Sequence, residues 1–151
     1  DPKLPEAGQH GHLEAVRSAC GAGAADGGRM EGASPLIAAS LHGHLGVVRH
    51  LCTAGADKDQ TDASGATALL VAAEAGHLEL VKMLCDAGAD KDKDFPDGET
   101  PMCMASHSGH VAVVSFLCDV GADKDKAFQD GSTPLFLASL VGHLGVVQCL
   151  C

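Results

Sequence analysis

The chain has 151 residues, and its 10 Lys and Arg residues against 20 Asp and Glu residues give a formal net charge of −10. This charge repels nucleic-acid phosphates and anionic membrane surfaces, and four Phe with no Trp or Tyr leave few aromatic platforms for stacking bases. We therefore expect no nucleic-acid partner. We also expect no direct membrane span, because no run of about 18 apolar residues is present.

A Gly-His dipeptide recurs five times along the chain at nearly constant spacing. The dipeptides are Gly11-His12, Gly43-His44, Gly76-His77, Gly109-His110 and Gly142-His143. A period of about 33 residues predicts a stack of one small structural unit, rather than a single globular core with a central pocket.

The N-terminal segment fits this unit poorly. It begins Asp1-Pro2-Lys3, without an initiator Met or an apolar targeting segment, so we expect a processed chain or a fragment of a longer one. A helix here would contain Pro5 and Gly8, and an interior Pro costs about 3 kcal/mol while Gly costs about 1 kcal/mol. We therefore expect an irregular segment before Gly11.

Each later unit opens with a helix-start signal. A Ser or Thr oxygen can cap free backbone N–H groups, and Pro is favoured at the first helical position. The matching pairs, one with Ala in place of Pro, are Ser34-Pro35, Thr67-Ala68, Thr100-Pro101 and Thr133-Pro134. We predict a first helix behind each pair, ended by the Gly of the Gly-His dipeptide, because Gly readily adopts a positive φ.

A second helix is predicted directly after each Gly-His dipeptide. Leu78, Val81 and Leu84 are apolar at helical spacing, so one face of this helix is expected to be buried. A Gly-Ala-Asp triplet then ends the second helix. A polar stretch follows and turns at a Gly, for example Asp97-Gly98, before the next unit begins.

Together these motifs resemble the ankyrin repeat, whose pattern runs roughly D-x-x-G-x-T-P-L-H-x-A-A-x-x-G-H-x-x-V-V-x-L-L-L-x-x-G-A-D. The resemblance implies an all-α solenoid of stacked helix-turn-helix units with hairpin-like finger loops, in a single domain. Members of this family overwhelmingly bind other proteins, an expectation that comes from the resemblance and not from periodicity. The repeats would be a degenerate first one at 1–28, full ones at 29–61, 62–94 and 95–127, and an incomplete one at 128–151.

One departure from the family pattern concerns the His that usually follows Thr-Pro-Leu. Ile37, Leu70, Cys103 and Phe136 stand at that place instead. In the family this imidazole ties neighbouring repeats by hydrogen bonds. We therefore expect apolar contact to do more of that work here.

Five of the seven cysteines also follow the repeat, and we expect them to be small hydrophobic core residues. Equivalent points on stacked helices lie about 8 to 10 Å apart, whereas a disulfide needs Cα atoms within roughly 7 Å. Free thiols fit a reducing intracellular compartment, the cytoplasm or, after removal of a targeting segment, an organelle. The repeating positions are Cys20, Cys52, Cys85, Cys118 and Cys151.

No residue pattern favours catalysis or a cofactor. Every candidate His, Cys or Asp recurs by repeat and is interpreted as part of the scaffold, so we expect no enzymatic activity. The Gly-His histidines are spread one per repeat and do not converge on a metal ion. An opportunistic metal site at Cys103, His107 and His110 is the weaker alternative to structural or solvated side chains.

The Asp-Lys-Asp-Lys-Asp stretch at 90–94 imitates a calcium-binding loop. Phe95 and Pro101, however, occupy the places where such a loop requires Gly and Glu. We interpret the stretch as alternating charge on a solvated finger.

Partner contacts are expected at the finger tips and on the concave side of the first helices, as in the ankyrin family. Phe95 and Phe128 occupy equivalent finger positions, where they are either exposed anchors or rings folded back onto the neighbouring finger. Leu41, Leu140 and Val141 are apolar where the family is usually polar. The expected partner-binding residues are Arg29, Met30, Leu41, His42, Glu74, Phe95, Pro96, His107, Phe128, Gln129, Leu140 and Val141.

Two functions remain after these exclusions. The first is a non-catalytic protein–protein interaction module, for which the negative charge favours a partner with a basic patch. The alternative is a structural peripheral subunit or module held within a larger multi-protein assembly. At the C-terminal end, Val146, Val147 and Leu150 are expected to form an uncovered apolar face that further repeats, a cap or a partner would cover.

Overall fold

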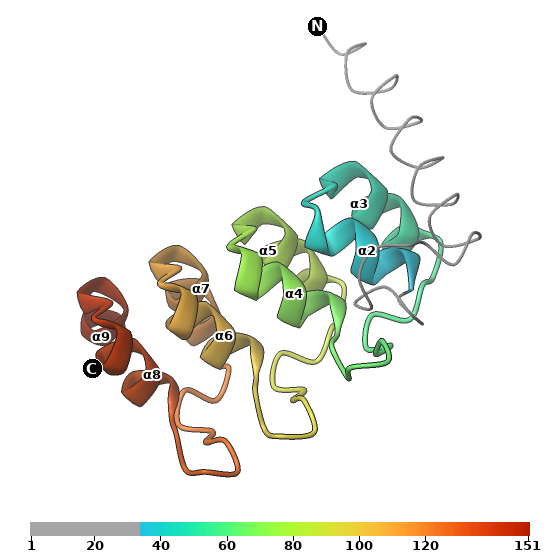
Figure 1. Cartoon of the computed structure of the whole chain (residues 1–151). Helices are drawn as coiled ribbons and strands as arrows, with labels where there is room; N and C mark the ends of the chain where they lie inside the picture. Colours follow the sequence, from blue (N-terminus) through green and yellow to red (C-terminus); the bar gives the residue numbers. More distant parts are fainter. Residues whose placement is uncertain (1–33) are drawn as a thin grey trace, which may run out of the picture.

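The computed structural model describes residues 34–151, which form eight α-helices and no β-strand (Figure 1). This confirms the all-α class for the described residues, while the predicted first repeat at 1–28 lies outside them. The first helices of the four pairs are α2 (Pro35–Leu41), α4 (Ala68–Ala75), α6 (Pro101–Ser108) and α8 (Pro134–Val141). The second helices are α3 (Leu45–Thr53), α5 (Leu78–Asp86), α7 (Val111–Asp119) and α9 (Leu144–Leu150).

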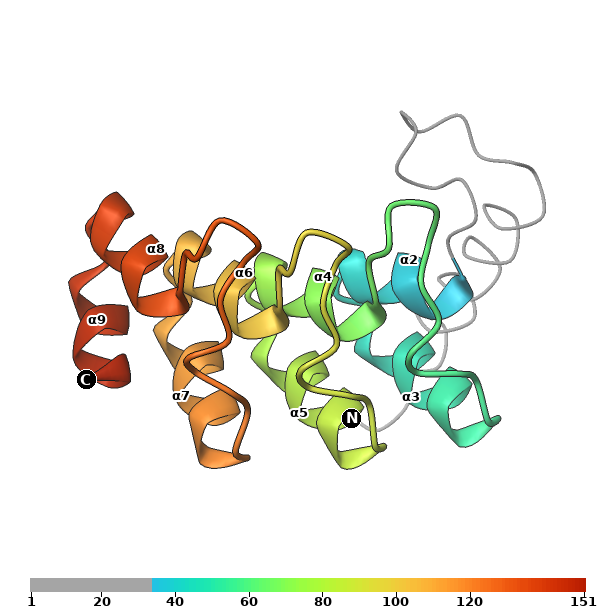
Figure 2. The same cartoon turned by 90° about the horizontal axis from the view of Figure 1, so that it is seen from below.

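The helix pairs stack into a solenoid, as predicted. Each first helix packs on the next first helix from α2 to α8, and the second helices pack in the same order from α3 to α9. Figure 2 shows the two rows of helices, and Figure 1 shows the connecting loops extending from one side of the stack. We call these loops, residues 54–67, 87–100 and 120–133, the fingers. No helix in the described range is long and apolar enough to cross a membrane.

The predicted caps are present at the start of every first helix in residues 34–151. Ser34 Oγ accepts a hydrogen bond from the Ile37 N–H at 3.3 Å, and Thr67 Oγ1 accepts one from the Leu70 N–H at 3.2 Å. The threonines before α6 and α8 make the same bond at 3.2 Å. Because a cap contributes about 1 kcal/mol, these residues define where each first helix begins.

Histidines of the Gly-His dipeptides also tie neighbouring repeats together, alongside the apolar contacts expected where the family usually has His. Nε2 of His110, just before α7, lies 2.9 Å from the backbone carbonyl oxygen of Glu74 in α4. Nε2 of His143 lies 3.0 Å from the carbonyl oxygen of His107. In the same way, Nε2 of His77, just before α5, lies 3.4 Å from the carbonyl oxygen of Leu41 in α2. The imidazole thus reaches carbonyls in the last turn of a helix, which have no partner within that helix.

Gly76 illustrates why Gly precedes these histidines. Its φ of 78° lies in the left-handed region, which ends α4 and favours Gly. In addition, a Cβ at this position would lie 2.6 Å from Cε1 of His110. The missing side chain therefore leaves room for the imidazole of the next repeat to reach Glu74.

The apolar core lies between successive helix pairs. Ile37, Leu70 and Cys103, which stand where the family usually has His, are at most 3% exposed. Phe136 occupies the same place in α8 but is 54% exposed, because α8 belongs to the last helix pair. The other large side chains that are fully buried are Leu36, Leu69, Leu80, Leu84, Met102, Leu117, Val48, Val81, Val113, Val114 and Val146.

The apolar end face differs from the prediction. Val146 and Leu150 are buried and Val147 is half-buried, because α9 packs on α7 and turns these residues into the stack. Sequence periodicity identifies the buried face of a helix but not which neighbour covers it. The exposed large apolar residues of this last helix pair are instead Leu135, Phe136, Leu140, Val141 and Leu144. We call them the end face.

Candidate functional site

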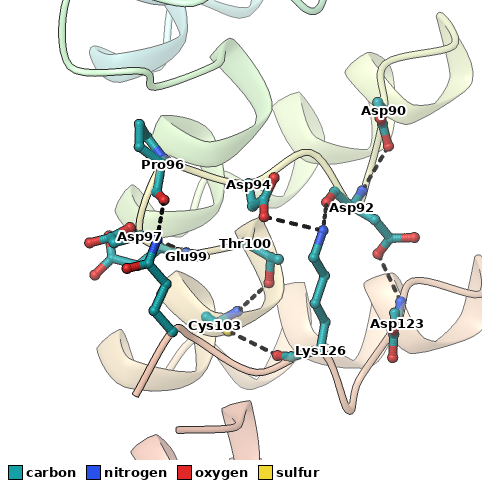
Figure 3. A network of polar contacts seen from close by, with 11 residues as sticks. Asp90, Asp92, Asp94, Pro96, Asp97, Glu99, Thr100, Cys103, Asp123 and Lys126 are labelled. Carbon is teal, nitrogen blue, oxygen red and sulfur yellow. Dashed lines mark hydrogen bonds and ion pairs between the residues drawn. The ribbon is translucent and has the colours of Figure 1, made fainter. Parts of the chain in front are cut away.

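Successive fingers are joined by a clasp of Asp and Lys residues (Figure 3). Lys126 Nζ donates to the backbone carbonyl oxygen of Asp92 at 2.9 Å, and the backbone N–H of Asp123 donates to Oδ1 of Asp92 at 2.8 Å. Lys126 also lies 3.5 Å from a carboxylate oxygen of Asp94, in a partly exposed ion pair worth at most about 1 kcal/mol. The clasp is thus built mainly on hydrogen bonds to Asp92.

The preceding pair of fingers repeats this clasp. Lys93 Nζ donates to the carbonyl oxygen of Asp59 at 2.8 Å, and the Asp90 N–H donates to Oδ1 of Asp59 at 2.8 Å. The 90–94 stretch thus carries alternating charge on a finger that is partly open to solvent, and its Asp92 and Lys93 side chains also bond to neighbouring fingers, which the pattern alone did not predict. The sequence does carry a signal for the clasp, namely a lysine that follows the bonded aspartate by 34 residues. The pairs are Asp59 with Lys93 and Asp92 with Lys126.

The finger tips are joined as well. Gln129 Nε2 donates to the Pro96 carbonyl oxygen at 2.7 Å, and the Gln129 N–H donates to the Asp97 carbonyl oxygen at 3.1 Å. Pro96 in turn packs closely on Gly65, since a Cβ there would lie 2.8 Å from Pro96 Cδ. Pro96 and Gln129, both predicted to contact a partner, therefore hold neighbouring fingers together.

The two finger aromatics are half-buried rather than exposed. Phe95 packs against the hydrophobic core, and its ring lies beside Gly65 of the preceding finger, 3.4 Å from where a Cβ would stand. Phe128 stands next to Gly98, with its Cα 3.1 Å from a Cβ built there. Of the two alternatives drawn from the sequence, the folded-back ring is the one observed for Phe95.

A recess of about 50 Å³ opens where Phe95 meets the ends of α2 and α4. It brings together three predicted contact residues, Leu41, Glu74 and Phe95, from three successive repeats. The rest of its lining comes from α2, α4 and the finger between them, namely Ile37, Asp62, Ser64, Ala66, Leu70 and Val71. First-helix ends and fingers therefore form one continuous surface here.

We call this surface the concave face. Besides the recess it includes residues at the ends of α2 and α6, of which His42 and His107 are exposed, whereas Leu140 and Val141 belong to the end face. Leu41 is half-buried and packs on the core, so it is less exposed than predicted. Leu140 and Val141 lie in α8 and do not line the recess. Arg29 and Met30 lie outside the described residues.

Acidic residues influence one another close to Glu74, one of the residues that line the recess. Burial raises the pKa of Glu99 above its usual value, and the carboxylates of Asp97 and Glu74 raise it further, against an opposing effect of His107. These groups therefore lie close enough to interact although they come from neighbouring repeats. The mutual repulsion of the carboxylates favours a cationic ligand at this surface.

The cysteine thiols of residues 34–151 are free, and several are shielded from solvent. Burial raises the pKa of Cys52, Cys103 and Cys118, and it raises that of Cys85 to about 11. The neighbouring thiol of Cys149 raises the pKa of Cys118 further. Such groups stay protonated at neutral pH and are weak nucleophiles. In residues 34–151, no three His, Cys, Asp or Glu side chains are arranged to hold a metal ion.

The comparison with known families agrees with this architecture. A family profile described as ankyrin repeats (3 copies) matches residues 4–95 and 90–151, which together span nearly the whole chain. No curated protein matches the chain. The repeated helix pairs, their fingers and the family profile lead to the same conclusion, that this chain belongs to the ankyrin-repeat family.

Proposed function

We propose that the chain is a non-catalytic protein-interaction module whose partner contacts the concave face. Ankyrin repeats generally bind other proteins. The observation that carries the proposal is the recess, because it gathers Leu41, Glu74 and Phe95 from three repeats into one accessible hollow. A non-catalytic role is supported by the engagement of His110 and His143 in ties between repeats.

Site-specific photo-crosslinking tests the proposal. A benzophenone amino acid placed at exposed His107 would lie on the concave face, and its backbone carbonyl would still accept the bond from His143. The matched control is the same amino acid at exposed Glu79 in α5, on the row of second helices. We expect crosslinks to protein partners from position 107 and few from position 79. Equal crosslinking from both positions would contradict the proposal.

The end face favours a second candidate, a structural module within a larger assembly. Leu135 is 37% exposed and Phe136 54%, whereas the equivalent residues of the preceding repeats, such as Leu69 and Leu70, are 1% exposed because the next helix pair covers them. In a solenoid such a face is covered by a further repeat, a cap or a partner, and this candidate assigns it to a partner in the assembly. If this function holds, Phe136→Lys should release the chain from its complexes in size-exclusion chromatography of cell extracts, while Glu74→Gln should not. The reverse ranking favours the interaction module.

Free thiols support a reducing compartment as the site of action. The thiols in residues 34–151 are unpaired, including half-buried Cys118 and Cys149 on adjacent second helices. Disulfides are rare in such compartments. Differential alkylation of freshly lysed cells should find the cysteines reduced, and a Cys118–Cys149 disulfide would count against this compartment.

A further inference from the structure

The recess on the concave face combines an apolar floor with acidic residues. Ile37, Leu70 and Val71 are buried and form the floor, while Leu41 and Phe95 are half-buried and form apolar walls. Two acidic residues, Asp62 and Glu74, complete the lining together with Ser64 and Ala66. The hollow therefore suits a side chain that is apolar along its length and polar at its tip.

The size of the recess narrows the choice of side chain. Its volume of about 50 Å³ exceeds the roughly 10 to 15 Å³ that one water requires, but is only about a third of the ~150 Å³ that holds a benzene ring. A narrow alkyl stem fits inside such a space, whereas an aromatic ring would not be enclosed by it. Lysine and arginine carry stems of this kind, which commonly lie along apolar surface while the charged head stays in contact with solvent.

The two carboxylates differ in what they can still bind. Oδ1 of Asp62 already accepts hydrogen bonds from the Ser64 N–H at 2.8 Å, the Ser64 hydroxyl at 2.6 Å and the Ala66 N–H at 3.0 Å. The carboxylate of Glu74, in contrast, has neither a hydrogen bond nor an ion pair with any residue in the described range. Glu74 therefore offers both carboxylate oxygens to a ligand, whereas Oδ1 of Asp62 is already occupied.

Glu74 also lies in a surplus of negative charge. Its charge raises the pKa of Glu99, as the charge of Asp97 does, so three acidic groups from two successive repeats influence one another. His107 has the opposite effect and lowers the pKa of Glu99. A cation delivered by a partner would relieve this repulsion.

We propose that the recess binds an arginine or lysine side chain of a protein partner. Its alkyl stem lies against Leu41 and Phe95, and its cationic head pairs with Glu74. The inference rests on the proposed function, because it names the partner chemistry that the concave face selects. It also explains how one recess can discriminate among partners, since an apolar residue would leave Glu74 without a counter-charge.

A random peptide library displayed on phage tests this proposal, with the full chain as bait. We expect the enriched peptides to share one arginine or lysine. Replacing that residue with norleucine, which keeps an alkyl stem and removes the charge, should weaken binding by about tenfold or more. Glu74→Gln should cause a similar loss without lowering the unfolding midpoint, because the backbone carbonyl that His110 contacts remains. Glu79→Gln on α5 is the matched control and should bind as the parent does.

Two other outcomes would overturn the inference in different ways. One outcome is that enriched peptides crosslink from position 107 and yet share no arginine or lysine, or that they bind the Glu74→Gln variant as tightly as the parent chain. Either result would refute binding of a cationic side chain in the recess and leave the concave-face function standing. Peptides that crosslink from position 79, or the absence of any enriched peptide, would count against both proposals.

Discussion

Glu74 has two separable roles, because its backbone and its side chain face different partners. Its carbonyl oxygen lies 2.9 Å from Nε2 of His110 and helps join two repeats, while its carboxylate bonds to no described residue and Glu74 is one of the residues that line the recess. A substitution that changes only the carboxylate therefore leaves the tie between repeats intact. This separation makes Glu74 a suitable position at which to measure binding without a change in folding.

The histidine tie predicts different costs for two equivalent glycine substitutions. Gly76 and Gly142 both adopt a positive φ, 78° and 88°, so Ala at either site costs about 1 to 2 kcal/mol of backbone strain. At residue 76 the new Cβ also meets His110, whereas at residue 142 nothing lies within 4 Å. We expect Gly76→Ala to lower the free energy of unfolding by a further ~1 kcal/mol or more. Urea titrations of both variants measure the difference, and equal costs would refute the steric role of Gly76.

The finger clasp predicts that Lys126 contributes to stability. Lys126→Met keeps much of the side-chain length but removes the hydrogen bond to Asp92 and the ion pair with Asp94. We expect a loss of about 1 to 2 kcal/mol. Exposed Lys124, on the same finger, is the control, and its Met variant should change stability by less than about 0.5 kcal/mol. Indistinguishable thermal midpoints for the two variants would show that the clasp contributes nothing.

Phe95 is expected to affect stability as well as binding. Its half-buried ring packs on the core, so Phe95→Ala should cost about 1 to 2 kcal/mol, less than the 3 to 5 kcal/mol typical of a fully buried ring. Phe136→Ala serves as the comparison because that ring is exposed at the end face, and we expect it to change stability little. Calorimetric melting of both variants tests the ranking, and a greater loss for Phe136→Ala would contradict the structure.

The raised pKa of Cys85 predicts slow chemical modification. With a pKa of about 11 the thiol remains protonated at pH 8, and only the thiolate reacts with iodoacetamide. We expect exposed Cys151 to be alkylated well before Cys85, with the rate at Cys85 rising as the pH approaches 11. Peptide mass spectrometry over a time course measures both sites. Faster labelling of Cys85 at pH 8 would rule out its burial in the folded chain.

The repeat itself was accessible to sequence reasoning because it depends on local chemistry. Thr67 caps its own helix and Gly76 ends it, so both act within a few residues and leave a pattern at a fixed period. The clasp of Asp92 and Lys126 was missed because it joins residues 34 apart across repeats, where only the stacking brings them together. For the same reason, the burial of Phe95 depends on the neighbouring finger and not on its own.

The central claim, that a protein partner contacts the concave face, is tested most directly by hydrogen–deuterium exchange. The partner is first identified by the crosslink from position 107, and exchange is then compared between the free chain and its complex with that partner. We expect exchange to slow at residues 62–76 and 95–108, which contain the fingers and first helices around the recess. Little change is expected in α3, α5 and α7. Slowing confined to these second helices would contradict a binding role for the concave face, and slowing confined to residues 135–144 would transfer that role to the end face.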